Sequence, residues 1–87
     1  TVMGAVSVRS PMVHAYVMVT TAAGASQHVL PEITALDGVT GAHVVAGEYD
    51  IIAEFEVADT GELLSRVTDR IQALDGVEST RTYMALD

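Results

Sequence analysis

The chain contains an internal repeat. Residues 33–39 (ITALDGV) and 71–77 (IQALDGV) are identical at six of seven positions and lie 38 residues apart. At the same offset, residues 13–49 align with residues 51–87 without a gap, and nine of the 37 pairs are identical. The identities fall at apolar and turn positions, as expected when one structural unit is used twice. The 87 residues therefore predict one small domain built from two similar halves.

Each half begins with an alternating pattern that is typical of a half-buried strand. Apolar residues occupy every second position over 13–19 and again over 51–57. A period of two places these side chains on one face of a strand. A second strand is expected after each Leu-Asp-Gly segment, over 39–47 and 77–86. A tight turn over 47–50 (Gly-Glu-Tyr-Asp) then joins the two halves.

A helix is expected between the two strands of each half. In the second half, Asp59 followed by Glu62 resembles a capping box, and Gly76 ends the helix as a C-terminal cap. The apolar face of this helix is formed by residues at helical spacing: Leu64, Val67, Ile71 and Leu74.

The first helix has a less certain start, because Pro31 lacks a backbone N–H and is tolerated only in the first turn. We expect this helix to begin at Ser26 or later and to stop at 37–38 (Asp-Gly). Its apolar face carries Val29, Ile33 and Leu36.

The order of elements, β-α-β-β-α-β, predicts an α+β domain with a ferredoxin-like fold. Such a fold has a four-stranded antiparallel sheet with two helices on one face. The opposite face stays uncovered, and several of its expected residues are apolar, so we expect a second subunit to cover it. The sequence therefore predicts at least a homodimer. The residues expected on this face are drawn from His14, Tyr16, Met18, Thr20, Ile52, Ala58, Thr82 and Met84.

Charge and composition exclude several functions. The chain has twelve acidic residues, four arginines and no lysine. Its net charge of −8 repels phosphate backbones and anionic membranes. The absence of cysteine excludes disulfides, thiolate catalysis and cysteine-ligated metals. No apolar run reaches the roughly 18 residues of a membrane helix, and residues 1–11 do not form a signal peptide. We expect a cytoplasmic protein whose domain spans residues 12–87, preceded by an added leader or flexible arm over 1–11.

The polar residues of the first and third strands allow an enzymatic interpretation. His14 lies beside Tyr16 on one strand face, and Glu54 and Glu56 occupy the equivalent face of the expected neighbouring strand. A His, Tyr and Glu set is suited to acid-base chemistry. The sequence shows no nucleophile or oxyanion hole, so a polar patch is the favoured interpretation and no catalytic residue is assigned.

Metal and nucleotide sites are not indicated. The three histidines, His14, His28 and His43, lack a second histidine at helical spacing. The glycines do not lead from a strand into a helix, as a phosphate-binding loop requires. We therefore expect neither a metal nor a cofactor.

The segment over 45–50 (Val-Ala-Gly-Glu-Tyr-Asp) offers a candidate ligand site. A turn glycine can expose backbone N–H groups to a carboxylate, while Asp50 can accept from an ammonium group. The two features together suit a zwitterion. The simpler interpretation is a hairpin in which Gly47 supplies a positive φ and Asp50 bonds to the backbone of its own turn.

Four motifs give the chain a family resemblance. They are Ala-Tyr-Val (15–17), Leu-Asp-Gly-Val (36–39), Gly-x-Tyr-Asp (47–50) and Gly-Val-x-x-Thr-x-Thr (76–82). In this order and spacing, residues 12–87 resemble the C-terminal amino-acid-sensing domain of the leucine-responsive and asparagine-responsive (Lrp/AsnC) transcription regulators, also called the RAM domain.

The resemblance implies a specific assembly and ligand. Members pair face to face into a dimeric α/β sandwich or barrel, and the dimers associate into rings, commonly octamers, with effector amino acids bound between dimers. Residues of the Gly-x-Tyr-Asp turn contribute to this pocket, and the last strand is a second source of polar contacts. The ligand-binding residues implied are Gly47, Glu48, Tyr49, Asp50, Thr80 and Thr82.

The chain departs from full-length members of the family in one respect. The eleven residues before Met12 are too short for a helix-turn-helix. The resemblance therefore implies a stand-alone effector domain that does not bind DNA itself and that acts on transcription with a full-length Lrp/AsnC regulator as partner. Two alternatives remain open: an α/β-barrel enzyme that uses His14, Tyr16 and Glu54, and an assembly subunit without a ligand.

Overall fold

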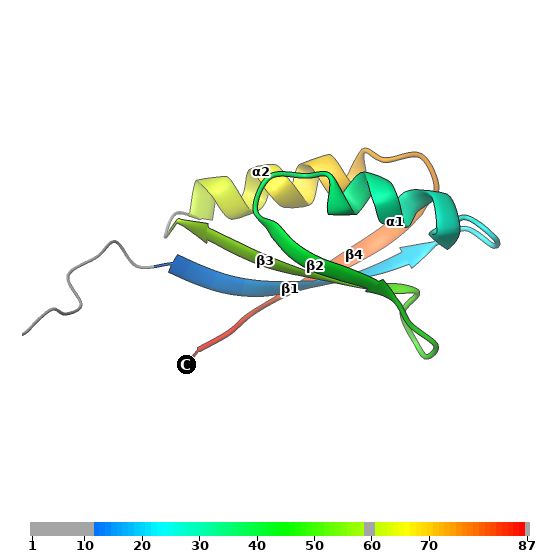
Figure 1. Cartoon of the computed structure of the whole chain (residues 1–87), viewed down its shortest axis with the longest axis horizontal. Helices are drawn as coiled ribbons and strands as arrows, with labels where there is room; N and C mark the ends of the chain where they lie inside the picture. The colour runs from blue at the N-terminus through cyan, green and yellow to red at the C-terminus, as the bar shows by residue number, and fades with distance from the viewer. Residues whose placement is uncertain (1–11, 59–60, 87) are drawn as a thin grey trace, which may run out of the picture.

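The computed structural model describes residues 12–58 and 61–86 of the chain. The leader predicted over 1–11 and the capping box predicted for Asp59 and Glu62 rest on residues or side chains outside this description. No helix among the described residues is long and apolar enough to cross a membrane. Figure 1 shows the elements in the expected order: β1 (Met12–Thr21), α1 (Ser26–Thr34), β2 (Val39–Val44), β3 (Ile51–Ala58), α2 (Gly61–Gln72) and β4 (Val77–Met84).

The four strands form one antiparallel sheet in the order β2-β3-β1-β4. Both helices lie on the same side of this sheet (Figure 1), which confirms the predicted ferredoxin-like fold. Each of the three strand pairings joins a strand of the first half to a strand of the second. Exchanging the halves leaves the strand order unchanged, so the sequence repeat corresponds to an internal two-fold symmetry of the sheet. We call the side without helices the open face.

The core lies between the sheet and the helices. As the alternating pattern predicts, the side chains of Ala15, Val17 and Val19 are fully buried on β1. Phe55 on β3 is the only phenylalanine of the chain and has no exposed surface. Among the side chains that the structure describes, the other fully buried ones are aliphatic, namely Val29, Ile33, Ile51, Ala53 and Ile71. Phe55 supplies the one aromatic ring of this buried set.

The repeated Leu-Asp-Gly-Val segments form matching turns after the two helices. In both repeats the leucine amide donates to the isoleucine carbonyl three residues earlier, at 3.0 Å. Gly38 and Gly76 then adopt φ values of 92° and 101°, which favour glycine. A Cβ atom on Gly76 would lie 3.1 Å from the side chains of Ala25 and Val29. Glycine is therefore required here by conformation and by space.

The first helix differs from the expectation at Pro31. Helix α1 begins at Ser26, so Pro31 lies inside the helix rather than in its first turn. The missing N–H leaves the carbonyl of Gln27 without a helical partner. Pro31 and Gln27 are both exposed, and water can bind this carbonyl. The Pro31 carbonyl still accepts from the amide of Ala35 at 3.1 Å.

Strand β4 contains an irregularity that reverses the expected direction of its side chains. Thr20 pairs with Ser79, but Thr21 pairs with Val77, so Glu78 is an extra residue in β4. Such a bulge shifts the alternation by one residue. Thr82 and Met84 pair with buried residues of β1 and lie on the helix side. Their predicted place on the open face is therefore wrong.

Candidate functional site

The connection between the two halves is a wider loop than predicted. Strand β2 ends at Val44, and the amide of Val45 donates to the carbonyl of Asp50 at 2.9 Å. Four residues lie between these two, in place of a tight turn. Within the described chain, residues 46–48 make no hydrogen bond, so their backbone N–H groups are free to bind a ligand. Gly47 and Glu48 are exposed.

Asp50 fastens this loop to the end of β1. Its carboxylate Oδ2 accepts from the amide of Thr21 at 2.8 Å, and its own amide donates to the Val19 carbonyl at 2.9 Å. Thr21 is only 9% exposed, so its amide depends on this carboxylate for a partner. The expectation that Asp50 bonds to its own turn through its side chain is wrong, since the partner is β1. The second oxygen, Oδ1, has no partner among the described residues.

Tyr49 is positioned beside two residues that sequence reasoning overlooked. The loop extends below the sheet in Figure 1, on the side away from the helices. The side chains of Tyr83 and Arg81 lie close enough to the Tyr49 hydroxyl to affect its pKa. Tyr83 and Arg81 pair with Tyr16 and Met18 of β1, on the open face. The bulge in β4 explains the oversight, because unbroken alternation places both on the helix side.

The surroundings of Tyr49 raise its pKa. Partial burial has the largest effect, Tyr83 and Glu48 act in the same direction, and Arg81 lowers the pKa. The neutral phenol is thus favoured in the folded chain, and folding stability should fall as the pH rises above the usual tyrosine pKa of about 10. We expect Tyr83→Phe to lower the pKa of Tyr49 and Arg81→Gln to raise it. Titration of ¹³C-labelled tyrosines by NMR checks both directions. If the pKa of Tyr49 moved in the same direction in both variants, this placement of Tyr49 would be contradicted.

Thr80 and Thr82, the other predicted ligand-binding residues, lie away from this loop. Both face the helix side, and the side-chain Nε2 of Gln72 donates to Thr80 Oγ1 at 2.7 Å. Thr82 lines an open depression of about 270 Å³ together with Ser65, Thr68 and Asp69 of α2. Within one chain, the two predicted groups of ligand-binding residues are therefore not brought together.

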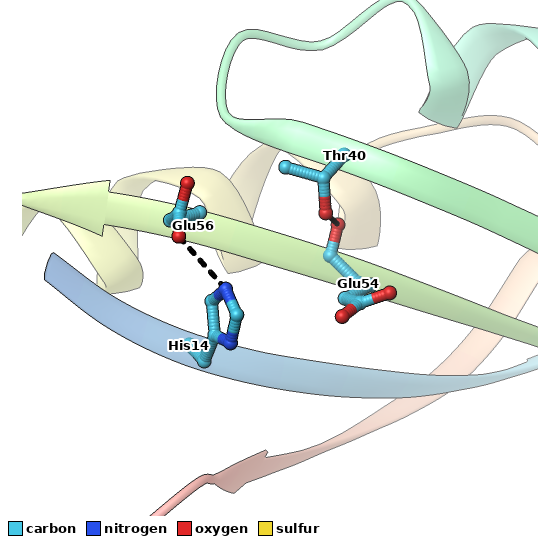
Figure 2. A network of polar contacts seen from close by, with 4 residues as sticks. All are labelled: His14, Thr40, Glu54 and Glu56. Atoms are coloured by element: carbon cyan, nitrogen blue, oxygen red, sulfur yellow. Dashed lines mark hydrogen bonds and ion pairs between the residues drawn. The ribbon is translucent and has the colours of Figure 1, made fainter.

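The polar residues of the open face form a pair different from the expected set. His14 Nε2 and Glu56 Oε2 lie 2.8 Å apart, as Figure 2 shows, with both side chains more than 40% exposed. Tyr16 is adjacent to Glu54 in the strand register. The structure thus pairs His14 with Glu56 rather than with Glu54. An exposed contact of this kind is a surface feature that needs no catalytic role.

The other two histidines are separate from this pair. His28 on α1 lies 3.4 Å from the carbonyl of Asp75, and His43 is exposed on β2. Over residues 12–58 and 61–86, no three His, Asp or Glu side chains gather as metal ligands would. The free loop amides and Asp50 therefore remain the features best suited to a small zwitterionic ligand.

Comparison with known proteins agrees with this architecture. FFRP-DM1 is 35% identical, with a TM-score of 0.77 over 85% of this chain and 99% of its own. AsnC of E. coli is 25% identical, with a TM-score of 0.76 over 86% of this chain and 51% of its own. The leucine-responsive regulatory protein of Haemophilus influenzae is 33% identical over 55 residues, 63% of this chain and 33% of the regulator. The chain thus spans about a third of that curated relative.

The family model supports a more specific assignment. The model of the Lrp/AsnC ligand binding domain matches residues 14–87, which include every element after the start of β1. Since this match covers most of the sequence, the chain belongs to the Lrp/AsnC ligand-binding domain family.

Proposed function

We propose that this chain binds a free amino acid at the 45–50 loop and that binding controls the assembly of a ring of homodimers. The proposal rests on two features of one loop. Within the described chain, the backbone amides of residues 46–48 make no hydrogen bond, and neither does Oδ1 of Asp50. Amides can bind the carboxylate of an amino acid, and Oδ1 can accept from its ammonium group. Gly47, Glu48, Tyr49 and Asp50 form this half of the site.

The second half of the site comes from another subunit in this proposal. Thr80 and Thr82 lie on the helix side and cannot meet the loop of the same chain. A ligand between dimers would contact the loop of one subunit and these hydroxyls of a neighbour. Such a ligand stabilises the ring because it binds the assembled state more tightly than the free dimer.

The open face supports a homodimer as the unit of the ring. Tyr16, Met18 and Ile52 are partly exposed at its centre, where no helix covers them. A second copy would remove these apolar side chains from water. We expect four such dimers to form an octamer.

Relatives with bound ligands guide the choice of effector. Structures of the feast or famine regulatory protein of M. tuberculosis (22% identical, TM-score 0.73) and of NMB0573 from Neisseria meningitidis (17% identical, TM-score 0.74) are complexes with L-methionine. For this chain we propose a small amino acid, without assigning its side chain. The chain has a net charge of −8, which disfavours contact with DNA. In this proposal it acts on transcription by associating with a full-length Lrp/AsnC regulator.

Light scattering with and without a pool of the twenty amino acids tests the proposal. Without ligand we expect dimers or a dimer–ring mixture, and with the pool a mass near eight chains of 9.1 kDa. Runs at low and high salt separate ligand effects from charge repulsion.

Acetate and methylamine at matched concentrations are the controls, since each carries only one of the two charged groups. A mass that no amino acid changes, combined with no heat of binding in calorimetry, would overturn the proposed sensing function. If acetate shifted the mass as an amino acid does, a carboxylate would be sufficient for binding, and the zwitterion site would be overturned.

A further inference from the structure

Two opposite charges on the open face lack a partner within the described chain. Arg81 on β4 makes no hydrogen bond or ion pair there, and neither does the carboxylate of Glu54 on β3. The contact of Glu54 with Thr40 in Figure 2 uses its backbone carbonyl, which accepts from the Thr40 hydroxyl at 3.2 Å. Arg81 is exposed and Glu54 is half-buried.

The two residues lie on strands that are not neighbours in the sheet. Glu54 lies opposite Tyr16, whereas Arg81 lies opposite Met18, so β1 separates them. Adjacent strands are about 4.8 Å apart, so two such spacings separate β3 from β4, and the structure shows no ion pair between the two side chains. Because both residues lie on the open face, both charges are on the side of the sheet away from the helices.

The other carboxylate of β3 is already engaged, because Glu56 Oε2 lies 2.8 Å from His14 Nε2. Glu48 and Asp50 lie on the 45–50 loop rather than in a strand. Glu54 is therefore the open-face carboxylate of the strands that remains available. In a chain with twelve acidic residues and four arginines, an arginine without an anion is itself notable.

We propose that Arg81 of one copy pairs with Glu54 of a second copy when two open faces meet. The inference rests on the proposed homodimer and adds the residues that fix its register. Covering the face removes water from both charges, and a buried charge without a partner is strongly unfavourable. Two-fold symmetry makes the contact twice, placing β4 of each copy over β3 of the other.

Charge reversal with rescue tests this pair. Sedimentation equilibrium would measure the dimer dissociation constant of the 87-residue chain and of Arg81→Glu, Glu54→Arg and the double variant. Each single variant places like charges together, and we expect a rise of about tenfold or more, as for close interfacial charge pairs. The double variant restores opposite charges and should return to within about threefold of the original value.

Two exposed residues on the helices provide controls matched for net charge. Arg70→Glu changes the net charge from −8 to −10, as Arg81→Glu does, and Glu32→Arg changes it to −6, as Glu54→Arg does. Neither control should alter dimerisation by more than about threefold at 0.15 M salt, where exposed charges are screened. Circular dichroism confirms that each variant is folded.

The outcomes separate this pair from the homodimer on which it rests. An unaltered chain that stays monomeric at every concentration would overturn the homodimer and the pair together. A dimeric chain whose double variant is no better than the single variants would overturn the pair alone. Equal effects of Arg81→Glu and Arg70→Glu would do the same, since net charge would then explain the change.

Discussion

Replacing Phe55 with alanine should lower the free energy of unfolding by about 3–5 kcal/mol. The ring is fully buried on β3, and it is the largest fully buried side chain among the described residues. Truncating it to a methyl group leaves a cavity that the surrounding core can fill only in part. Since small domains are stable by only about 5–15 kcal/mol, the variant should be close to unfolding at room temperature. Urea denaturation at a fixed protein concentration measures the loss.

Phe55→Leu is the matched control, because it keeps most of the apolar volume and should cost less than about 1.5 kcal/mol. Tyr83→Ala removes a ring that is 47% exposed and should have a small effect on unfolding. A Phe55→Ala variant as stable as Phe55→Leu would show that the core can collapse around the cavity.

Asp50→Ala should destabilise the chain and abolish amino-acid binding together. Removing the carboxylate leaves the buried Thr21 amide without its acceptor, and hydrogen bonds to charged groups contribute about 1.5–3 kcal/mol. The 45–50 loop would also lose its attachment to β1. Urea denaturation and calorimetry with the effector found by light scattering measure the two losses.

Asp50→Asn separates the two roles. The asparagine oxygen can still accept from Thr21, so unfolding should change little, whereas the charge that attracts an ammonium group is lost. We expect affinity to fall about tenfold or more, corresponding to a charge-assisted hydrogen bond. Unchanged affinity in Asp50→Asn would contradict the ammonium contact, and unchanged stability in Asp50→Ala would contradict the attachment to Thr21.

The fold could be predicted because its determinants are local and occur twice. Alternation over 13–19 and 51–57 places the core residues of β1 and β3 correctly, and the repeated Leu-Asp-Gly-Val turns end both helices. The start of α1 was left open from Ser26 onward because the missing N–H of Pro31 is costly beyond the first turn. At the exposed position that it occupies, water can bind the carbonyl left without a helical donor.

The candidate site was harder to predict, because its geometry depends on pairing between strands. A single extra residue, Glu78, reverses the faces of β4, and no local signal in the sequence marks it. Sequence reasoning therefore assigned Thr82 to the open face and overlooked Arg81 and Tyr83. The role of Asp50 in holding β1 was equally hidden, since Thr21 lies 29 residues away along the chain.

The internal two-fold of the sheet also bears on how the chain acquires its structure. Because β1 pairs only with β3 and β4, and β2 pairs only with β3, neither half contains a strand pairing of its own. During synthesis, β1 and β2 have no native partner until residues 51–58 are made, so folding must be cooperative over the whole domain. Two separate copies of one half could build the same sheet, and the domain thus has the architecture of a small dimer fused into one polypeptide.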